Sequence, residues 1–254
     1  MISVSAAELD LWLAGFLYPF FRILALLAAA PLFAHRSVPR RVRIGLAVLL
    51  TLLVAPTLPP AAPVSPFTAE GVLLIVQQVL VGGALGLAVH VAFAAVGLAG
   101  DMIGLQMGLS FAAFIDPVNS EQSPIIGSFL TMTLMLVFVA INGHLLIVAA
   151  LVDSFATVPP TITGLRWVDA WKVAETGTAL FAQGLQIALP VIGAMLLTNL
   201  AFGILTRTAP QLNLFAVGFP VTLIVGLLVL LLGLRHQIPV FEGVLTRSVE
   251  LFAR

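Results

Sequence analysis

Long continuous runs of apolar residues are the feature that most limits what this chain can fold into. The first run, residues 12–34, would measure roughly 35 Å as a helix at about 1.5 Å per residue, more than the hydrocarbon core of a bilayer, about 30 Å. The runs do not alternate apolar with polar residues, which argues against transmembrane β-strands. The others cover residues 44–58, 70–114, 125–152, 176–206 and 212–234. We therefore expect an all-α, polytopic membrane-type protein of about six helices, or seven if the third run bends near Gly100.

Composition agrees with this class. The 254 residues are 61% hydrophobic and 9% charged, whereas an ordinary soluble domain is about 25% charged. Eleven basic residues balance eleven acidic ones, so no basic field exists to attract nucleic acid. The absence of cysteine excludes disulfides and thiolate metal sites. The first run lacks a basic leader and an obvious cleavage site, so we expect it to be retained, within one domain over residues 1–254.

The arginines do not fit a simple topology. Four of them lie between the first two runs, which predicts a cytoplasmic loop: Arg36, Arg40, Arg41 and Arg43. Six plain crossings would place the C-terminal tail, with its own arginines, on the opposite face. Re-entrant segments, or helices that pack on protein instead of lipid, would remove this conflict.

Polar side chains interrupt the apolar runs. Arg22 costs roughly 2.5–3.5 kcal/mol at the centre of a membrane helix and so needs a partner. It either makes a structural ion pair or carbonyl contact, or it lines a conduit. Most of the others should hold helices together: Gln77, Gln78, His90, Gln106, Asn142, His144, Gln183, Gln186 and Asn199. We expect Asp101 and Asp116 to cap helices or lie in loops, with a proton relay as the alternative.

Glycines at four-residue spacing predict close helix packing. Gly82 and Gly86 form one pair, and Gly100, Gly104 and Gly108 form a tandem series. The spacing does not distinguish packing within one subunit from packing between subunits.

Motifs for catalysis are absent from the sequence. The only lysine is Lys172, so there is no phosphate-binding loop of the G-x-x-x-x-G-K type. No nucleophile elbow or H-E-x-x-H motif occurs, and the four histidines show no metal-ligand spacing. We expect no enzyme activity, no metal and no cofactor, and a membrane module that transports, gates or assembles.

Three stretches resemble, in order and wording, the flagellar biosynthetic protein FliR family, the R subunit of the flagellar type III protein-export gate. They cover residues 22–47, 104–148 and 198–227, the second beginning GLQMGLSFAAFIDPVNSEQSP. Related injectisome subunits share the P-Q-L-N motif at residues 210–213. They tend to carry a lysine soon after the proline that corresponds to Pro220, and its absence here favours the flagellar branch.

The resemblance implies a subunit of an assembly of helical hairpins around a protein-conducting pore. Residues 1–175 would form a P-like part and residues 176–254 a Q-like part. Expected partners are the P and Q subunits, other membrane components of the export apparatus and exported unfolded proteins, with no nucleic acid. The expected location is the bacterial inner membrane within the flagellar basal body.

The resemblance also implies site residues. The loop from Gly108 to Ser123 would project into the pore and plug it, with Phe111 and Phe114 as an apolar constriction that excludes water. Alternatively, these phenylalanines end a helix by packing on its neighbours. The full set for this loop is Met107, Phe111, Phe114, Asp116 and Pro117. A polar break between the last two runs, expected as a hairpin turn or an inter-subunit contact, contains Arg207, Pro210, Gln211 and Asn213.

Two rival functions remain open. A small-solute secondary transporter would use Arg22, His90 and Asp101 as a binding or relay set and Pro190 as a helix break. An assembly factor would contribute packing surface and no pore.

Overall fold

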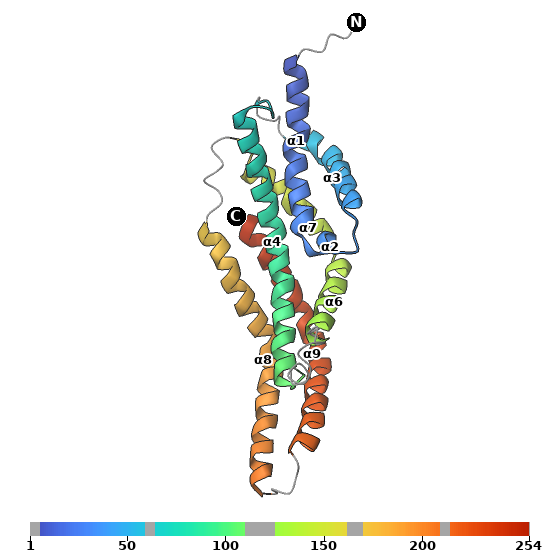
Figure 1. Cartoon of the computed structure of the whole chain (residues 1–254), viewed down its shortest axis with the longest axis vertical. Helices are drawn as coiled ribbons and strands as arrows, with labels where there is room; N and C mark the ends of the chain where they lie inside the picture. The colour runs from blue at the N-terminus through green and yellow to red at the C-terminus, as the bar shows by residue number, and fades with distance from the viewer. Residues whose placement is uncertain (1–5, 59–63, 110–124, 162–169, 209–213, 254) are drawn as a thin grey trace, which may run out of the picture. The chain divides into compact units, whose positions relative to one another are not determined.

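The computed structural model describes residues 6–58, 64–109, 125–161, 170–208 and 214–253, and their regular structure is helical (Figure 1). This confirms the all-α fold. The helices are, in order, α1 (Ala6–Ala29), α2 (Pro31–Ala34), α3 (Arg40–Val54), η1 (Ala55–Thr57), α4 (Ala69–Gln106), α6 (Ile125–Ala140), α7 (Gly143–Thr157), α8 (Ala170–Thr208) and α9 (Leu214–Ala253).

The described chain forms two compact units. The first comprises Met1–Val91, Asn142–Gly177 and Leu245–Arg254, and the second comprises Ala92–Ile141 and Thr178–Val244. Helices α4, α8 and α9 therefore contribute residues to both units. The single domain and its division after residue 175 stay predictions, and that boundary lies inside α8.

In the first unit, α4 packs closely on α1. A Cβ atom added to Gly82 would overlap the carbonyl oxygen of Arg22, and one added to Gly86 would lie 2.5 Å from the Cβ of Ala29. Glycine is therefore required at both positions for the two backbones to approach. Farther along, Tyr18 is fully buried and donates a hydrogen bond of 2.9 Å to the carbonyl of Val64. Gly82 and Gly86 therefore pack against another helix of the same chain.

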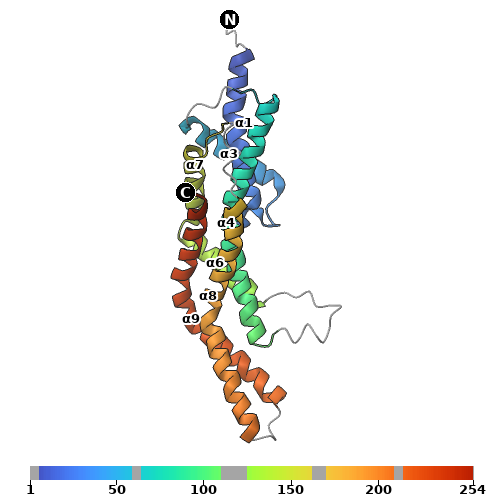
Figure 2. The same cartoon turned by 90° about the vertical axis from the view of Figure 1, so that its left-hand side faces the viewer.

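In the second unit, the last turns of α4 contact α6 and α8. Gly100 lies so close to Gly127 of α6 that an added Cβ would be 2.5 Å from the Gly127 nitrogen. The rings of Phe93 and Phe138 meet edge to face with centroids 6.0 Å apart. An added Cβ at Gly184 of α8 would be 2.9 Å from a carbonyl oxygen of α4, and Figure 2 shows these helices side by side.

Several helices are long and apolar enough to cross a membrane. Within the described residues there are four: Glu8–Ala29, Ala69–Gln106, Glu175–Thr208 and Val217–Leu234. Helices α6 and α7 pass the same test together, as a broken span or a re-entrant loop. The second apolar run forms α3, which has 15 residues, and ends in η1. The chain is thus a membrane-type helical protein, with fewer plain spans than apolar runs.

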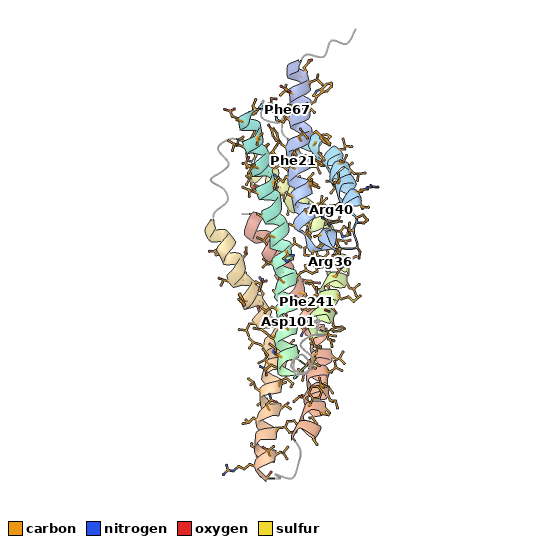
Figure 3. All side chains as sticks on the ribbon, viewed as in Figure 1. Phe21, Arg36, Arg40, Phe67, Asp101 and Phe241 are labelled. Atoms are coloured by element: carbon orange, nitrogen blue, oxygen red, sulfur yellow. The ribbon has the colours of Figure 1, made fainter. Side chains whose placement is uncertain are left out.

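Three expectations about individual helices were wrong. The fourth run breaks after Ala140, because Asn142 adopts a left-handed conformation with φ 56° and ψ 36°. The last helix continues to Ala253, well beyond the apolar run, because helix formation does not require apolar side chains. Asp101 neither caps a helix nor lies in a loop: it is an exposed residue inside α4, which continues through Gly100 (Figure 3).

Candidate functional site

A buried arginine near the middle of α1 links three helices of the first unit. Arg22 has no exposed surface. Its Nε donates to Oε1 of Gln78 on α4 at 2.8 Å. Its Nη1 donates to the carbonyl and the hydroxyl oxygen of Ser154 on α7 at 2.7 and 3.1 Å, and its Nη2 donates to the carbonyl of Val158 at 2.6 Å. One side chain thus joins α1, α4 and α7.

The C-terminal end of α7 supplies the electrostatic partner of this cation. Ser154 lies in the last turn of α7, and Val158 is its C-cap residue. Unpaired carbonyls at this end of a helix carry a partial negative charge of roughly half a unit. The Arg22 guanidinium carbon also lies 4.0 Å from the centre of the Phe155 ring, in cation–π geometry. No carboxylate is among these partners, so peptide dipoles and an aromatic face stabilise the charge.

The hydrogen bonds continue outward from Arg22. The hydroxyl of Ser154 donates to the carbonyl of Leu151 at 2.6 Å while it accepts from Arg22. On α4, Nε2 of Gln78 donates to Oε1 of Gln77 at 3.2 Å. Gln77 is 3% exposed, and its Nε2 has no acceptor within the described part of the chain. The cluster is therefore a buried polar core in which the amide nitrogen of Gln77 has no acceptor among the described residues.

The contacts of Arg22 can be compared with its two predicted roles, a structural ion pair or carbonyl contact and a residue that lines a conduit. A residue that lines a conduit must present its charge to a water-filled space. Arg22 instead directs its donors at protein acceptors and has no exposed surface. It makes the carbonyl contacts expected of a structural partner.

The second unit holds both ends of segment 110–124, whose own residues lie outside the described part of the chain. Helix α4 ends in a glycine cap: Gly108 has φ 80° and donates to the carbonyl of Leu105 at 3.1 Å, and Leu109 donates to the carbonyl of Gly104 at 3.0 Å. This pair of bonds is the Schellman motif, in which glycine favours the left-handed position. Gly108 thus ends the helix, and Gly104 meets no described atom within 4 Å of an added Cβ.

Segment 110–124 connects α4 to α6, and α6 begins beside α4. Met107, the last residue before Gly108, is 2% exposed and packs on Gly226 of α9. At the other end, Gly127 of α6 packs on Gly100. Gly100 and Met107 are about two turns, roughly 10 Å, apart along α4. Both attachment points of segment 110–124 are therefore close together.

The other predicted residues lie at several places. Asn142, Asn199 and Arg207 are exposed, so within this chain they are not buried polar contacts; an inter-subunit role stays a prediction. Gln106 and His144 are partly buried. The remaining predicted residues lie outside the described part of the chain: Phe111, Phe114, Asp116, Pro117, Pro210, Gln211 and Asn213.

Asn142 adopts the left-handed backbone conformation at the break between α6 and α7, and substitutions there test whether this conformation selects the residue. Asparagine tolerates the left-handed region better than most residues, and glycine tolerates it best. We expect Asn142→Gly to leave stability unchanged or slightly raised, and Asn142→Val to lower it by roughly 1–2 kcal/mol. Thermal unfolding of the detergent-solubilised protein measures both. Leu145→Val, an exposed change on α7, controls for adding a β-branched residue; an equal loss there would contradict the interpretation.

Sequence reasoning missed several residues of these contacts. Contacts of Arg22 with Ser154, Phe155 and Val158 could not be predicted, because nothing near these residues in the sequence indicates an arginine 132 to 136 positions away. Gly127 and Gly226 were missed because each is a single glycine without a spaced partner. The one available signal was the charge of Arg22 itself, which required some partner.

Fold and site together define a polytopic helical protein of membrane type, with a buried arginine that joins three of its helices. The sequence matches the family described as bacterial export proteins, family 1, over residues 13–248. It is 42% identical to the flagellar biosynthetic protein FliR of Pectobacterium carotovorum subsp. carotovorum over 254 residues, which is 100% of this chain and 97% of that protein. It is 44% identical to FliR of Escherichia coli (strain K12), over 89% of this chain and 87% of that protein. For FliR of Bacillus subtilis (strain 168) the identity is 35%, over 93% and 92%. The chain therefore belongs to this family of bacterial export proteins, the family of FliR.

Proposed function

We propose that this chain is a non-enzymatic subunit of the bacterial flagellar type III export gate, located in the inner membrane, where it helps to form and plug the protein-conducting pore. The observation that carries the proposal is the similarity to FliR proteins over the whole chain, 42% over 254 residues. The relatives that support the family carry a flagellar name, which favours the flagellum over the injectisome.

Exposed apolar surface supports membership in an assembly. The spans on α8 and α9 bury only 22% and 17% of their most apolar windows within the chain, whereas the span on α4 buries 50%. Large side chains such as Leu197 and Leu232 are 70% exposed. Such surface requires lipid or other subunits to cover it. We propose that the P and Q subunits of the gate cover part of it.

Purification tests this assignment. We expect the tagged chain to copurify from membranes with homologues of the P and Q subunits. A stable, isolated monomer that transports a small solute in vesicles would overturn the proposal in favour of a secondary transporter. That rival would need Arg22 as a binding or relay group, yet its donors are engaged by protein acceptors.

Phe111 and Phe114 are proposed as the constriction of the plug. Replacing both by alanine should raise the leak of ions or small dyes through the assembled complex severalfold, because smaller side chains at a narrow point let water enter. The measurement is flux from vesicles that contain the purified assembly. Phe67→Ala is a matched control, since Phe67 is 77% exposed just before α4 (Figure 3). Normal assembly with unchanged flux in the double variant would contradict the plug.

A further inference from the structure

An exposed basic patch lies where the chain turns from α2 into α3. Arg36 is in the connection between these helices and Arg40 begins α3, and both are exposed (Figure 3). Arg41, the next residue, is also exposed. Arg43 differs, because it is only partly exposed and its Nε donates to the carbonyl of Phe33 in α2 at 3.1 Å. Arg43 therefore secures the turn, while the other three arginines, here called the arginine patch, remain exposed.

The arginine patch has no acidic neighbour in the sequence. The chain contains no aspartate or glutamate between Asp10 and Glu70. Within the described part of the chain, no hydrogen bond or ion pair engages the three side chains. Three positive charges thus lie within six residues, and such a group attracts anions from its surroundings. Guanidinium groups suit phosphate in particular, because their fixed fork of N–H donors matches its oxygens.

The outer face of α3 is apolar directly beyond the arginine patch. Five large aliphatic side chains of α3 are 48–65% exposed: Val42, Ile44, Leu49, Leu52 and Leu53. The residues of α3 that are buried within the chain include the small Ala47 and Thr51, and α3 packs on α1. Contacts between helices in membranes favour small side chains, whereas large aliphatic ones match lipid tails. Charge at one end and large apolar side chains beyond it follow the order of a lipid headgroup and its tails.

We propose that the arginine patch and the outer face of α3 form a binding site for an anionic phospholipid. The guanidinium groups bind the headgroup phosphate, and the acyl chains lie along Leu49 and Leu52. Arginine serves both regions, because its apolar stem lies along the tails while its charged end reaches the headgroup layer. Leu49 is eight residues, roughly 12 Å, beyond Arg41, which is within one leaflet of a hydrocarbon core about 30 Å thick. This site goes beyond the proposed function and does not depend on it.

A single fluorescent label can test the site, because the chain contains no cysteine. Leu49→Cys is labelled, and phosphatidylglycerol with brominated acyl chains is titrated into the purified full-length protein in detergent. Bromine quenches the label only when the acyl chains lie beside α3. We expect quenching at a roughly hundredfold lower concentration than with brominated phosphatidylcholine, since each basic residue strengthens binding to an anionic surface by about fivefold. Leu197→Cys on α8, where the native leucine is 70% exposed, is the matched control and should respond equally to both lipids.

Substitution of the arginines tests the charge. Replacing Arg36, Arg40 and Arg41 together by glutamine should remove the preference for phosphatidylglycerol. Replacing the same three by lysine should keep most of it, because lysine also binds phosphate, as a point charge. Ser37→Ala, an exposed change in the same turn, should leave quenching unchanged. Unfolding temperature and elution volume check that the triple variants fold; if one does not, each single glutamine variant should still weaken binding about fivefold.

Every other outcome overturns the inference. Equal quenching by the two lipids with the arginines intact would contradict it, and so would a preference that survives the triple glutamine variant. The same preference at residue 197 would place the lipid elsewhere. Displacement by an equal concentration of glycerol 3-phosphate would indicate a site for a soluble anion. If neither lipid is preferred and the triple glutamine variant loses a copurifying subunit, the arginine patch is a protein interface. None of these measurements involves protein export, so the proposed function stands or fails separately.

Discussion

Replacing Arg22 by leucine should largely abolish recovery of the assembled complex and lower its unfolding temperature. Among the described residues, the substitution removes the donors to Gln78 Oε1 and to the carbonyl of Val158, and one of the donors to the Ser154 carbonyl. A buried polar group left without its partner costs about 1–3 kcal/mol, and total stabilities are only about 5–15 kcal/mol. Yield after affinity purification and a thermal melt in detergent measure the effect.

Arg22→Lys separates charge from geometry. Lysine keeps the positive charge but has a compact head with three donors, and it lacks the planar fork that lets Arg22 reach α4 and α7 at once. We expect intermediate yield. Arg40→Leu, an exposed change at the start of α3, is the control and should leave yield unchanged (Figure 3). If Arg22→Leu assembled normally and altered only transport, the structural interpretation would be wrong and a conduit role would gain support.

Gly82→Ala should damage the first unit almost as severely as loss of Arg22. The new methyl group would overlap the backbone carbonyl of Arg22, which cannot move aside as a flexible side chain can. Overpacking of this kind typically costs about 1–3 kcal/mol. It would also move α1 away from α4 and so strain the bond between Arg22 and Gln78. The expected result is a clear fall in unfolding temperature and in yield of the complex.

The neighbouring glycine provides the matched control. An added Cβ at Gly83 meets no described atom within 4 Å. Gly83→Ala should therefore be tolerated, and it gains the usual helix preference of alanine, roughly 0.5–1 kcal/mol. The same glycine-to-alanine change should therefore lower the stability of the protein at residue 82 and raise it slightly at residue 83. Equal effects of the two substitutions would contradict the close approach of α1 and α4.

The sequence predicted the helices better than it predicted their ends. Continuous apolarity indicated where helices lie, because burial in lipid or protein favours such runs. It could not reveal that Asn142 divides the fourth run, since an asparagine within an apolar run can equally make a polar contact between helices. Nor could it indicate that α9 continues past residue 234, because charged and amide residues form helix readily without contributing hydropathy.

The glycines also show what spacing in the sequence can and cannot predict. Four-residue spacing indicated close packing, which holds for Gly82, Gly86 and Gly100. It does not hold for Gly104, which meets no described atom within 4 Å of an added Cβ, and the left-handed φ of Gly108 ends α4. Spacing alone describes a helix that continues, so it cannot distinguish a packing glycine from a helix stop.

By itself, the sequence determined the class of protein, through apolar runs long enough to span a bilayer and a wording shared with FliR proteins. It also required that Arg22 have a partner, because an unpaired charge is too costly in an apolar helix. Only the tertiary structure decided that the partner of Arg22 is the C-terminal end of α7, and that Met107 packs against Gly226 of α9. Both contacts join residues more than 100 positions apart. Local patterns carry no record of such pairs, since they form only when the helices have packed.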